Sequence, residues 1–329
     1  MEYPEKILHQ LSNAGGLGVI SGINIGYDEE GFNKDPLSTN LKSLKKHIQK
    51  AKELSNNKPL GINPMVAMNF YEEHVKTAIE AGIDIIISGA GLPIKLPKFI
   101  GNSNVKIAPI VSSAKACKLL LKMWDKKYNK TADMIVVEGP KAGGHLGFHR
   151  DDLKDIDSID YDGEFMRILE ITKEYGQKYD KEIPVIAAGG ISTSSDVKKY
   201  INMGAAGVQV GTLFVATEEC DANITFKNTY IKCKKEDIKI IKSPVGLPGR
   251  AIYNKFLEKL ESNKPKIKKC YNCMETCNPS STPYCISQAL INAVNGDIDN
   301  ALLFCGAEAY KINKIKTVKK VIDELISEI

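Results

Sequence analysis

The chain has 329 residues, of which 43% are hydrophobic, and its 45 lysines and arginines are nearly balanced by 40 acidic residues, for a net charge of +5. This length and composition suffice for one large core, and we expect one α/β barrel with an appendage. The basic residues alternate with acidic or apolar ones, which indicates solvated helix faces and argues against a nucleic-acid partner.

No uninterrupted apolar run approaches the roughly 20 residues of a membrane span, and residues 1–6 lack a signal-peptide pattern. We therefore expect a cytoplasmic protein with no membrane partner. Eight cysteines in a chain of this length do not make the dense framework of a small secreted protein. The thiols are expected to be reduced unless a metal binds some of them.

Strand-like and helix-like stretches alternate along most of the chain. Seven apolar runs predict strands at residues 17–20, 60–67, 83–89, 105–111, 134–138, 183–190 and 207–212. Helical spacing of apolar residues between them predicts helices at 37–54, 71–81, 114–128, 164–179 and 194–203. This alternation favours right-handed βαβ units and a parallel sheet, either closed as a barrel or open and doubly wound.

The ends of the predicted strands favour the barrel. Several strands run into small or polar residues, namely Ser88-Gly89, Glu138-Gly139, Gly189-Gly190 and Gly211-Thr212, as expected where strand ends surround one ligand. No G-x-G-x-x-G opens the first helix, which argues against a nicotinamide-binding Rossmann domain. We therefore predict a TIM-type (β/α) barrel.

Residues 134–147 carry the strongest catalytic signal. Here an apolar strand ends in Glu138 and continues through Gly143 and Gly144 to His145. Glycines let a flat ligand approach the backbone, and an imidazole can move protons beside it. His145 is the predicted catalytic residue, although a turn with an incidental histidine is the alternative. His149, further into the polar loop, is expected at the surface.

The last two predicted strands carry a second signal. In β/α barrels the loops after these strands commonly bind a phosphate through backbone N–H groups. Residues 188–190 (Ala-Gly-Gly) and 211–212 (Gly-Thr) suit that role. Ordinary βα turns are the alternative for either pair alone.

Residues 13–18 (Asn-Ala-Gly-Gly-Leu-Gly), 143–147 (Gly-Gly-His-Leu-Gly) and 184–190 (Pro-Val-Ile-Ala-Ala-Gly-Gly), with Glu138-Gly139 and Gly211-Thr212, resemble the nitronate monooxygenase family, formerly 2-nitropropane dioxygenases. The family also contains flavin-dependent enoyl-ACP reductases, which the 143–147 segment resembles at least as closely. The resemblance covers most of residues 8–255 and implies an FMN-binding barrel with His145 beside the flavin. It implies that the following residues line FMN and its phosphate: Asn63, Ser88, Gly89, Ala90, Gly91, Gly144, Ala188, Gly189, Gly190, Gly211 and Thr212. Glu138 either orients its loop or accepts a hydrogen bond from the flavin side. The alternative is that backbone N–H groups satisfy the hydrogen-bonding capacity of its carboxylate.

The chain departs from this family at its start. Family members open with a strand that ends in a Gln-Gly-Gly-Met-like turn at the flavin, whereas this chain begins in the helix that follows. The predicted barrel therefore lacks its first strand. Either it is open, with two unpaired edges, or another segment or subunit fills the gap.

The resemblance implies two reactions for a small-molecule substrate. In the first, an alkyl nitronate is oxidised with O2 through FMN, and His145 hydrogen-bonds it or handles its proton. In the second, NAD(P)H reduces FMN, and hydride then goes to the β-carbon of an enoyl thioester while His145 donates a proton or stabilises an oxyanion. A different class of protein is a non-catalytic barrel that has lost a strand. His145 fits both reactions and does not discriminate between them.

Residues 243–252 form a segment rich in Pro and Gly that contains one arginine. As a loop, it can cap the flavin pocket, with Arg250 facing an anionic substrate or a cofactor phosphate. A purely structural turn is the alternative.

We divide the chain into the barrel, residues 1–258, and a Cys-rich helical extension, residues 259–329. A charged linker at 259–269 leads to a C-x₂-C-x₃-C-x₇-C pattern. Tetrathiolate sites are typical of zinc or iron–sulfur centres, but small packing residues are the alternative. Helices are expected at 286–294, 300–309 and 318–329, packed over the barrel or at the subunit interface of a homo-oligomer. The predicted metal ligands are Cys270, Cys273, Cys277 and Cys285.

Overall fold

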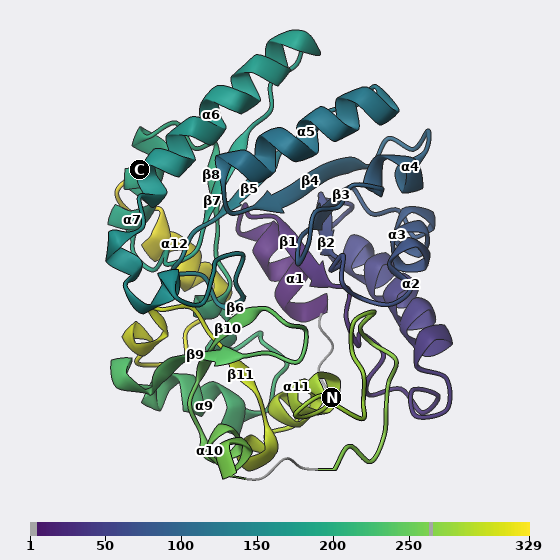
Figure 1. Cartoon of the computed structure of the whole chain (residues 1–329), viewed down its shortest axis with the longest axis vertical. Coiled ribbons are helices and arrows are strands. Elements are labelled where there is room, and N and C mark those ends of the chain that lie inside the picture. The colour runs from purple at the N-terminus through teal and green to yellow at the C-terminus, as the bar shows by residue number, and fades with distance from the viewer. Residues whose placement is uncertain (1–4, 263–265) are drawn as a thin grey trace.

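The computed structural model describes residues 5–262 and 266–329, in which a curled parallel sheet carries helices on its outer face (Figure 1). Seven strands form this sheet in the order β1-β2-β3-β4-β5-β7-β8, and every pairing is parallel. The seven predicted strands are confirmed with small shifts at their ends. Their bounds are β1 (Gly18–Ser21), β2 (Leu60–Asn63), β3 (Ile85–Ser88), β4 (Lys106–Val111), β5 (Ile135–Glu138), β7 (Val185–Ala188) and β8 (Gly207–Gln209).

The helices that connect these strands begin at capping residues that the sequence supplies. The side chains of Asp35, Ser113, Asp160 and Thr193 each accept a hydrogen bond from a backbone N–H of the helix that follows. The helices of this layer are α1 (Glu5–Asn13), α2 (Pro36–Leu54), α3 (Tyr71–Glu80), α4 (Leu96–Ile100), α5 (Ala114–Tyr128), α6 (Tyr161–Lys178), α7 (Ser194–Asn202) and α8 (Thr212–Val215). None of the helices in the described chain is long and apolar enough to cross a membrane.

The barrel is missing one strand, as the sequence indicates. β1 and β8 are the two ends of the sheet, and no strand within residues 5–262 or 266–329 pairs with their outer edges. Helix α12 (Val318–Leu325) packs against α1 on one side of this gap and against α7 and α8 on the other. Val321 and Leu325 of this helix are buried in the main core, and Val318 at its start is fully buried as well. Helix α12 therefore bridges the helices on the two sides of the gap between β1 and β8.

A second, smaller sheet lies beside the strand ends in the lower half of Figure 1. Its central strand, β10 (Pro248–Ile252), pairs antiparallel with β9 (Ile238–Lys242), with β6 (Gly144–His145) and with β11 (Leu303–Phe304). Helices α9 (Ile224–Lys232), α10 (Lys255–Ser262) and α11 (Ile286–Val294) surround it. The short 3₁₀ turns of the described chain are Asp152–Lys154, Ile156–Ser158, Lys235–Asp237, Ile298–Asn300 and Ala309–Lys311.

Two sequence-based expectations for this region are wrong. Residues 243–252 are not one loop, because Pro248–Ile252 is strand β10 and only 243–247 form the turn of a hairpin. Residues 300–309 are not a helix: they contain β11, and Ala301, Leu302 and Leu303 are all fully buried. Consecutive buried apolar residues lack the apolar–polar alternation that would have revealed a strand. The predicted helix at 286–294 is confirmed, and the last one ends at Leu325. Residues 263–265 of the predicted linker lie outside the described residues.

Candidate functional site

The inner face of the sheet is apolar at its base and becomes polar at the carboxyl ends of the strands. Ile85, Ile87, Ala108, Val136 and Ala188 form one buried cluster on this face. Their neighbours along the strands, such as Ile86 and Val137, pack instead in the outer core against the helices. Successive side chains of a strand point to opposite faces of the sheet. Each residue at a strand end can therefore be assigned to the inner face or to the face that the helices cover.

Three polar side chains fall on the inner face by this alternation. Glu138 lies on the same side of β5 as Val136, Gln209 lies on the same side of β8 as Gly207, and Asn63 lies on the opposite side of β2 from the outward-packed Ile62. In the register of the sheet, Glu138 is opposite Ala188, which is itself opposite Gln209. The Asn63 amide donates to the carbonyl of Ile87 at 2.8 Å. The sequence analysis did not predict Gln209 as a site residue. The alternation of side chains along residues 207–212 could have placed it on the inner face.

Glu138 is held in an environment that favours its protonated form. Burial raises the pKa of its carboxyl group to about 8, and the nearby Arg250 only partly offsets this effect. The group therefore carries a proton at neutral pH and is able to donate a hydrogen bond toward the barrel interior.

This raised pKa predicts a pH-dependent stability. The unfolded carboxyl group ionises above its ordinary pKa of 4.5, whereas the folded one keeps its proton until about 8. The native state thus binds more protons in this window, so its free energy of unfolding falls as the pH rises from about 4.5 to about 8. Glu138→Gln should remove this loss, which is on the order of 5 kcal/mol for a pKa that rises from 4.5 to about 8. Urea unfolding of the wild-type chain and of Glu138→Gln at pH 4.5 and pH 8 measures the difference. If the free energy of unfolding changed equally with pH in the two proteins, the raised pKa given to Glu138 would be wrong.

His145 lies on β6, in the loop that follows β5, and two neighbours orient its ring. Its Nε2 atom is 2.7 Å from Oγ of the buried Ser243. The ring of Phe304 packs edge-on against it with centroids 4.9 Å apart. Burial lowers the pKa of His145 to about 4, so the imidazole is neutral at physiological pH. His149 is exposed, as expected.

Arg250 does not face a ligand, so the expectation that it contacts a substrate or a phosphate is wrong. Its side chain is 4% exposed, and its guanidinium donates to the carbonyl of Pro140 at 2.8 Å and to that of Ala142. Its partners are thus the main chain of the loop between β5 and β6. The alternative reading of Arg250 as a structural residue fits this geometry, because the side chain holds the loop that carries His145.

Removing this support is expected to destabilise the fold. Arg250→Met keeps most of the side-chain volume but leaves two buried carbonyl groups without their donor, which should lower the free energy of unfolding by about 2–4 kcal/mol. The control is Arg150→Met, since Arg150 is exposed in the same region of the chain. Urea unfolding measures both variants, and an equal effect of the two changes would rule out the role given to Arg250.

The segment after β3 adopts a tight turn packed against its neighbours. The Ser88 side chain faces outward, where its hydroxyl donates to the Pro64 carbonyl at 2.9 Å and lies 2.8 Å from the Tyr71 hydroxyl. The φ angles of Ala90 and Gly91 are positive, at 52° and 123°. The Val66 N–H donates to the Gly89 carbonyl at 2.8 Å, which ties this turn to the loop after β2. Ser88 therefore contributes only its backbone to the inner face.

The glycines at the last two strand ends differ in their surroundings. Gly189 and Gly190 have φ angles of 93° and 79°, and a Cβ at either would clash with the loop at 139–142. By contrast, a Cβ at Gly211 or Gly144 would meet no atom within 4 Å. The Thr212 hydroxyl accepts from the Gly306 N–H at 2.9 Å, so this side chain binds the C-terminal segment. The backbone at Gly144 and Gly211 is therefore open to the close approach of another group.

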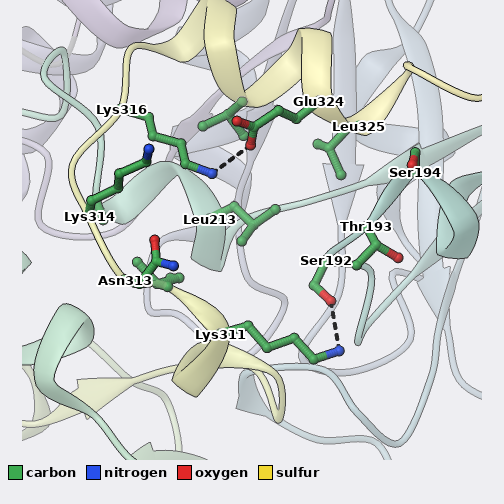
Figure 2. Close-up of a pocket in the computed structure, with 13 residues that line it drawn as sticks. Ser192, Thr193, Ser194, Leu213, Lys311, Asn313, Lys314, Lys316, Glu324 and Leu325 are labelled. Carbon is green, nitrogen blue, oxygen red and sulfur yellow. Dashed lines mark hydrogen bonds and ion pairs between the residues drawn. The ribbon is translucent and has the colours of Figure 1, made fainter.

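A separate cavity of about 260 Å³ lies outside this group of residues. Figure 2 shows Lys311, Lys314 and Lys316 on one side of it and Ser192–Ser194 on the other. Two of the lysines already have partners: Lys311 donates to Ser192 at 3.3 Å, and Lys316 pairs with Glu324 at 2.5 Å (Figure 2). None of the residues predicted to bind FMN lines this cavity.

The four C-terminal cysteines do not form a site for a single metal ion. Within the described parts of the chain, no three His, Cys, Asp or Glu side chains lie close enough together to hold one. The expectation of a metal centre at these cysteines, either a zinc ion or an iron–sulfur cluster, is therefore not supported. All four cysteines nevertheless line one cavity of about 20 Å³.

The fold is a parallel β/α barrel with one strand missing, and polar side chains lie at the carboxyl ends of its strands. A family model of nitronate monooxygenases matches residues 5–328, so the chain belongs to the nitronate monooxygenase family and is an oxidoreductase. A probable nitronate monooxygenase of Staphylococcus aureus (strain MSSA476) is 25% identical over 292 residues, which cover 80% of this chain and 75% of that protein.

Two solved structures share the fold over the length of the chain. FabK from Thermotoga maritima superimposes with a TM-score of 0.72 at 24% identity, covering 98% of this chain and 88% of its own. A nitroalkane oxidase from Streptomyces ansochromogenes gives a TM-score of 0.71 at 18% identity, covering 100% of this chain and 92% of its own.

Proposed function

We propose that the chain is an FMN-dependent oxidoreductase that oxidises alkyl nitronates with O2. The observation that carries this proposal is the position and protonation of His145. Its neutral imidazole lies on the loop after β5, at the carboxyl edge of a sheet whose inner face is apolar. This edge is where β/α barrels do their chemistry.

The residues around the inner face suit a flavin. Gly144 and Gly211 leave backbone open to a close approach, and Glu138, protonated at neutral pH, would offer a hydrogen-bond donor on the inner face. Gly189, Gly190, Thr212 and the turn at 89–91 would then shape the site mainly through their backbone. FMN, when bound, supplies the acceptor for substrate electrons and the donor for O2.

In this proposal His145 acts on the substrate rather than on the cofactor phosphate. A neutral imidazole can donate a hydrogen bond to a nitronate oxygen or accept a proton from the substrate. The contact with Ser243 occupies Nε2, while Nδ1 has no hydrogen-bond partner among the described residues. Ser243 thus positions the ring and sets which nitrogen can meet the substrate.

Reduction of an enoyl thioester by NAD(P)H is the second candidate. The segment 143–147, Gly-Gly-His-Leu-Gly, favours it because this form of the motif resembles that of the flavin-dependent enoyl-ACP reductases. A non-catalytic barrel is the third reading of the sequence.

Two assays on the FMN-reconstituted full chain separate these functions. The first measures O2 consumption with a small alkyl nitronate, and the second measures NADH oxidation with an enoyl thioester. Turnover in the first supports the proposal, and turnover only in the second supports the alternative. Activity in neither assay, with FMN bound, would contradict both enzyme readings for these substrates.

A further inference from the structure

A further cavity, of about 260 Å³, lies between the loops after β1 and β2 and the Cys-rich segment. None of the residues predicted to bind FMN lines it, and neither does His145. Its volume is close to the lower end of the roughly 300–1,000 Å³ that small-molecule sites occupy. Four asparagine side chains are part of its wall, and we call it the asparagine cavity after them: Asn24, Asn40, Asn69 and Asn272.

Hydrogen bonds between segments far apart in the sequence hold this wall in place. The Asn69 amide donates to the carbonyl and to Oδ1 of Asn272, at 2.9 and 2.8 Å. The Asn69 N–H also donates to the Cys273 carbonyl at 3.0 Å. On the other side, the Asn24 amide donates to Oγ of Ser287, a fully buried residue of α11, at 2.9 Å. The cavity is therefore built on packed elements that position its lining in advance.

His74 lines the cavity from α3 and has an unused hydrogen-bond acceptor. The residue is only 3% exposed, and its Nδ1 atom lies 2.8 Å from the Phe70 carbonyl. A carbonyl can only accept, so Nδ1 carries the ring proton. Burial lowers the pKa of His74 and keeps the ring neutral, which leaves Nε2 as an acceptor. Nε2 has no hydrogen-bond partner in the described chain, so the site favours a ligand that supplies a donor.

Asn40 supplies a complementary donor from α2, the helix that packs against α3. The residue is 8% exposed, and its Oδ1 accepts from the Gly26 N–H at 2.9 Å. Its Nδ2 donates to no group of the described residues. The asparagine cavity thus offers one acceptor and one donor, each from a side chain that is more than nine-tenths buried.

Phe70 brings an aromatic ring to the cavity in a strained backbone conformation. Its φ and ψ angles are 59° and 35°, in the left-handed region that bulky side chains rarely adopt. The residue is 36% exposed, and its ring contacts no other aromatic ring of the described chain. Left-handed residues of this kind persist only where the surrounding structure imposes them, and they cluster at ligand sites.

The charge of the lining disfavours an anion. Asp35 is the only charged residue among the described residues that line the cavity, and its carboxylate accepts from the Ser38 N–H at 3.0 Å as the cap of α2. A long acyl chain also fits poorly, because it would leave His74 and Asn40 without partners. An uncharged, flat heterocycle that carries a donor and an acceptor and rests on Phe70 satisfies all of these groups.

We propose that the asparagine cavity binds an amino-substituted nucleobase such as adenine. Its exocyclic amino group donates to Nε2 of His74, a ring nitrogen accepts from Nδ2 of Asn40, and the ring stacks on Phe70. Amide side chains and aromatic faces are groups with which proteins recognise bases. This inference does not rest on the proposed flavin function, because none of these three residues belongs to the predicted flavin site.

The test measures adenosine binding to the purified full chain by isothermal titration calorimetry, with and without saturating FMN. We expect one adenosine per chain and the same dissociation constant in both conditions. Inosine carries a carbonyl oxygen in place of the amino group, so two acceptors would face each other, and it should bind at least about tenfold more weakly. AMP should bind no more tightly than adenosine, since no lysine or arginine of the described chain lines the cavity.

Two variants assign the binding to this cavity. His74→Asn keeps a donor for the Phe70 carbonyl but removes Nε2, and Phe70→Asn removes the ring while introducing a residue that tolerates a left-handed φ. Each should weaken adenosine binding by at least about tenfold. The matched control is His149→Asn, which changes an exposed histidine outside the cavity and should leave the dissociation constant unchanged.

Urea unfolding of the same samples shows whether each variant is folded, and if one variant unfolds, the other decides. Loss of adenosine binding in a variant of native stability supports the proposal. Four results overturn it: no binding of adenosine to the wild-type chain, displacement of adenosine by FMN, tighter binding of inosine or AMP than of adenosine, or equal affinity for adenosine in the wild-type chain and the folded variants.

Discussion

Replacing His145 with alanine is expected to lower turnover by about 10²- to 10⁴-fold, the usual cost of losing general acid–base assistance. FMN and the fold should be retained, because His145 lies on β6 and the open backbone at Gly211 is on another strand end. The reaction that falls identifies the substrate: nitronate with O2, or enoyl thioester with NADH. Steady-state kinetics of the FMN-loaded variant measures the effect.

The matched control for this variant is His149→Ala, which removes an exposed histidine from the same loop region. It should keep turnover within a factor of about two. If His145→Ala retains full activity in the assay that the wild-type chain passes, the loop after β5 only shapes the flavin pocket. The proposed role of His145 would then be wrong.

Placing a carboxylate at Gly211 is expected to weaken FMN binding by about 10²- to 10³-fold. A unit charge about 4 Å from a phosphate charge costs on the order of 4 kcal/mol near a protein surface. Gly211 suits this test because it has a φ of −120° and no atom within 4 Å of an added Cβ, so the side chain itself causes no strain. Fluorescence titration of the apoprotein with FMN measures the dissociation constant of Gly211→Asp.

Gly211→Asn separates charge from size and should change the dissociation constant by less than about tenfold. Gly189 makes a poorer target, because its φ of 93° and its contacts with the loop at 139–142 would strain any substitution. Equal affinities of the wild-type chain and Gly211→Asp would mean that the phosphate binds elsewhere.

Much of the barrel could be predicted from local pattern. Apolar runs with β-branched residues predicted the seven strands, and the helical spacing of apolar residues predicted most of the helices between them. The small sheet could not be predicted in this way. Its strand β11 is two residues long, and β6 is defined only by its pairing with Gly249 and Arg250, about a hundred residues away. Such pairings join residues far apart in the sequence and produce no periodic pattern of apolar residues that could predict them.

The site could be predicted in part. Family resemblance and strand ends pointed to His145, Glu138 and Gly211. Glu138 is the last residue of β5, Gly211 follows β8, and His145 lies on β6 in the smaller sheet. The direction of individual side chains was not available from residue type: Ser88 turns outward to Tyr71, and Arg250 turns inward to the main chain. Gln209 was overlooked because it lies between two valines, although alternation assigns it to the inner face.

The most direct test of the proposed function is an anaerobic titration of the FMN-reconstituted chain with an alkyl nitronate, followed by visible absorption. The proposal predicts about one FMN per chain, loss of the flavin band near 450 nm on adding the nitronate, and its return when O2 is admitted, as expected of a flavin that passes electrons from substrate to oxygen. A chain that takes up no FMN, or one whose bound flavin keeps its full absorption in the presence of the nitronate, would contradict it.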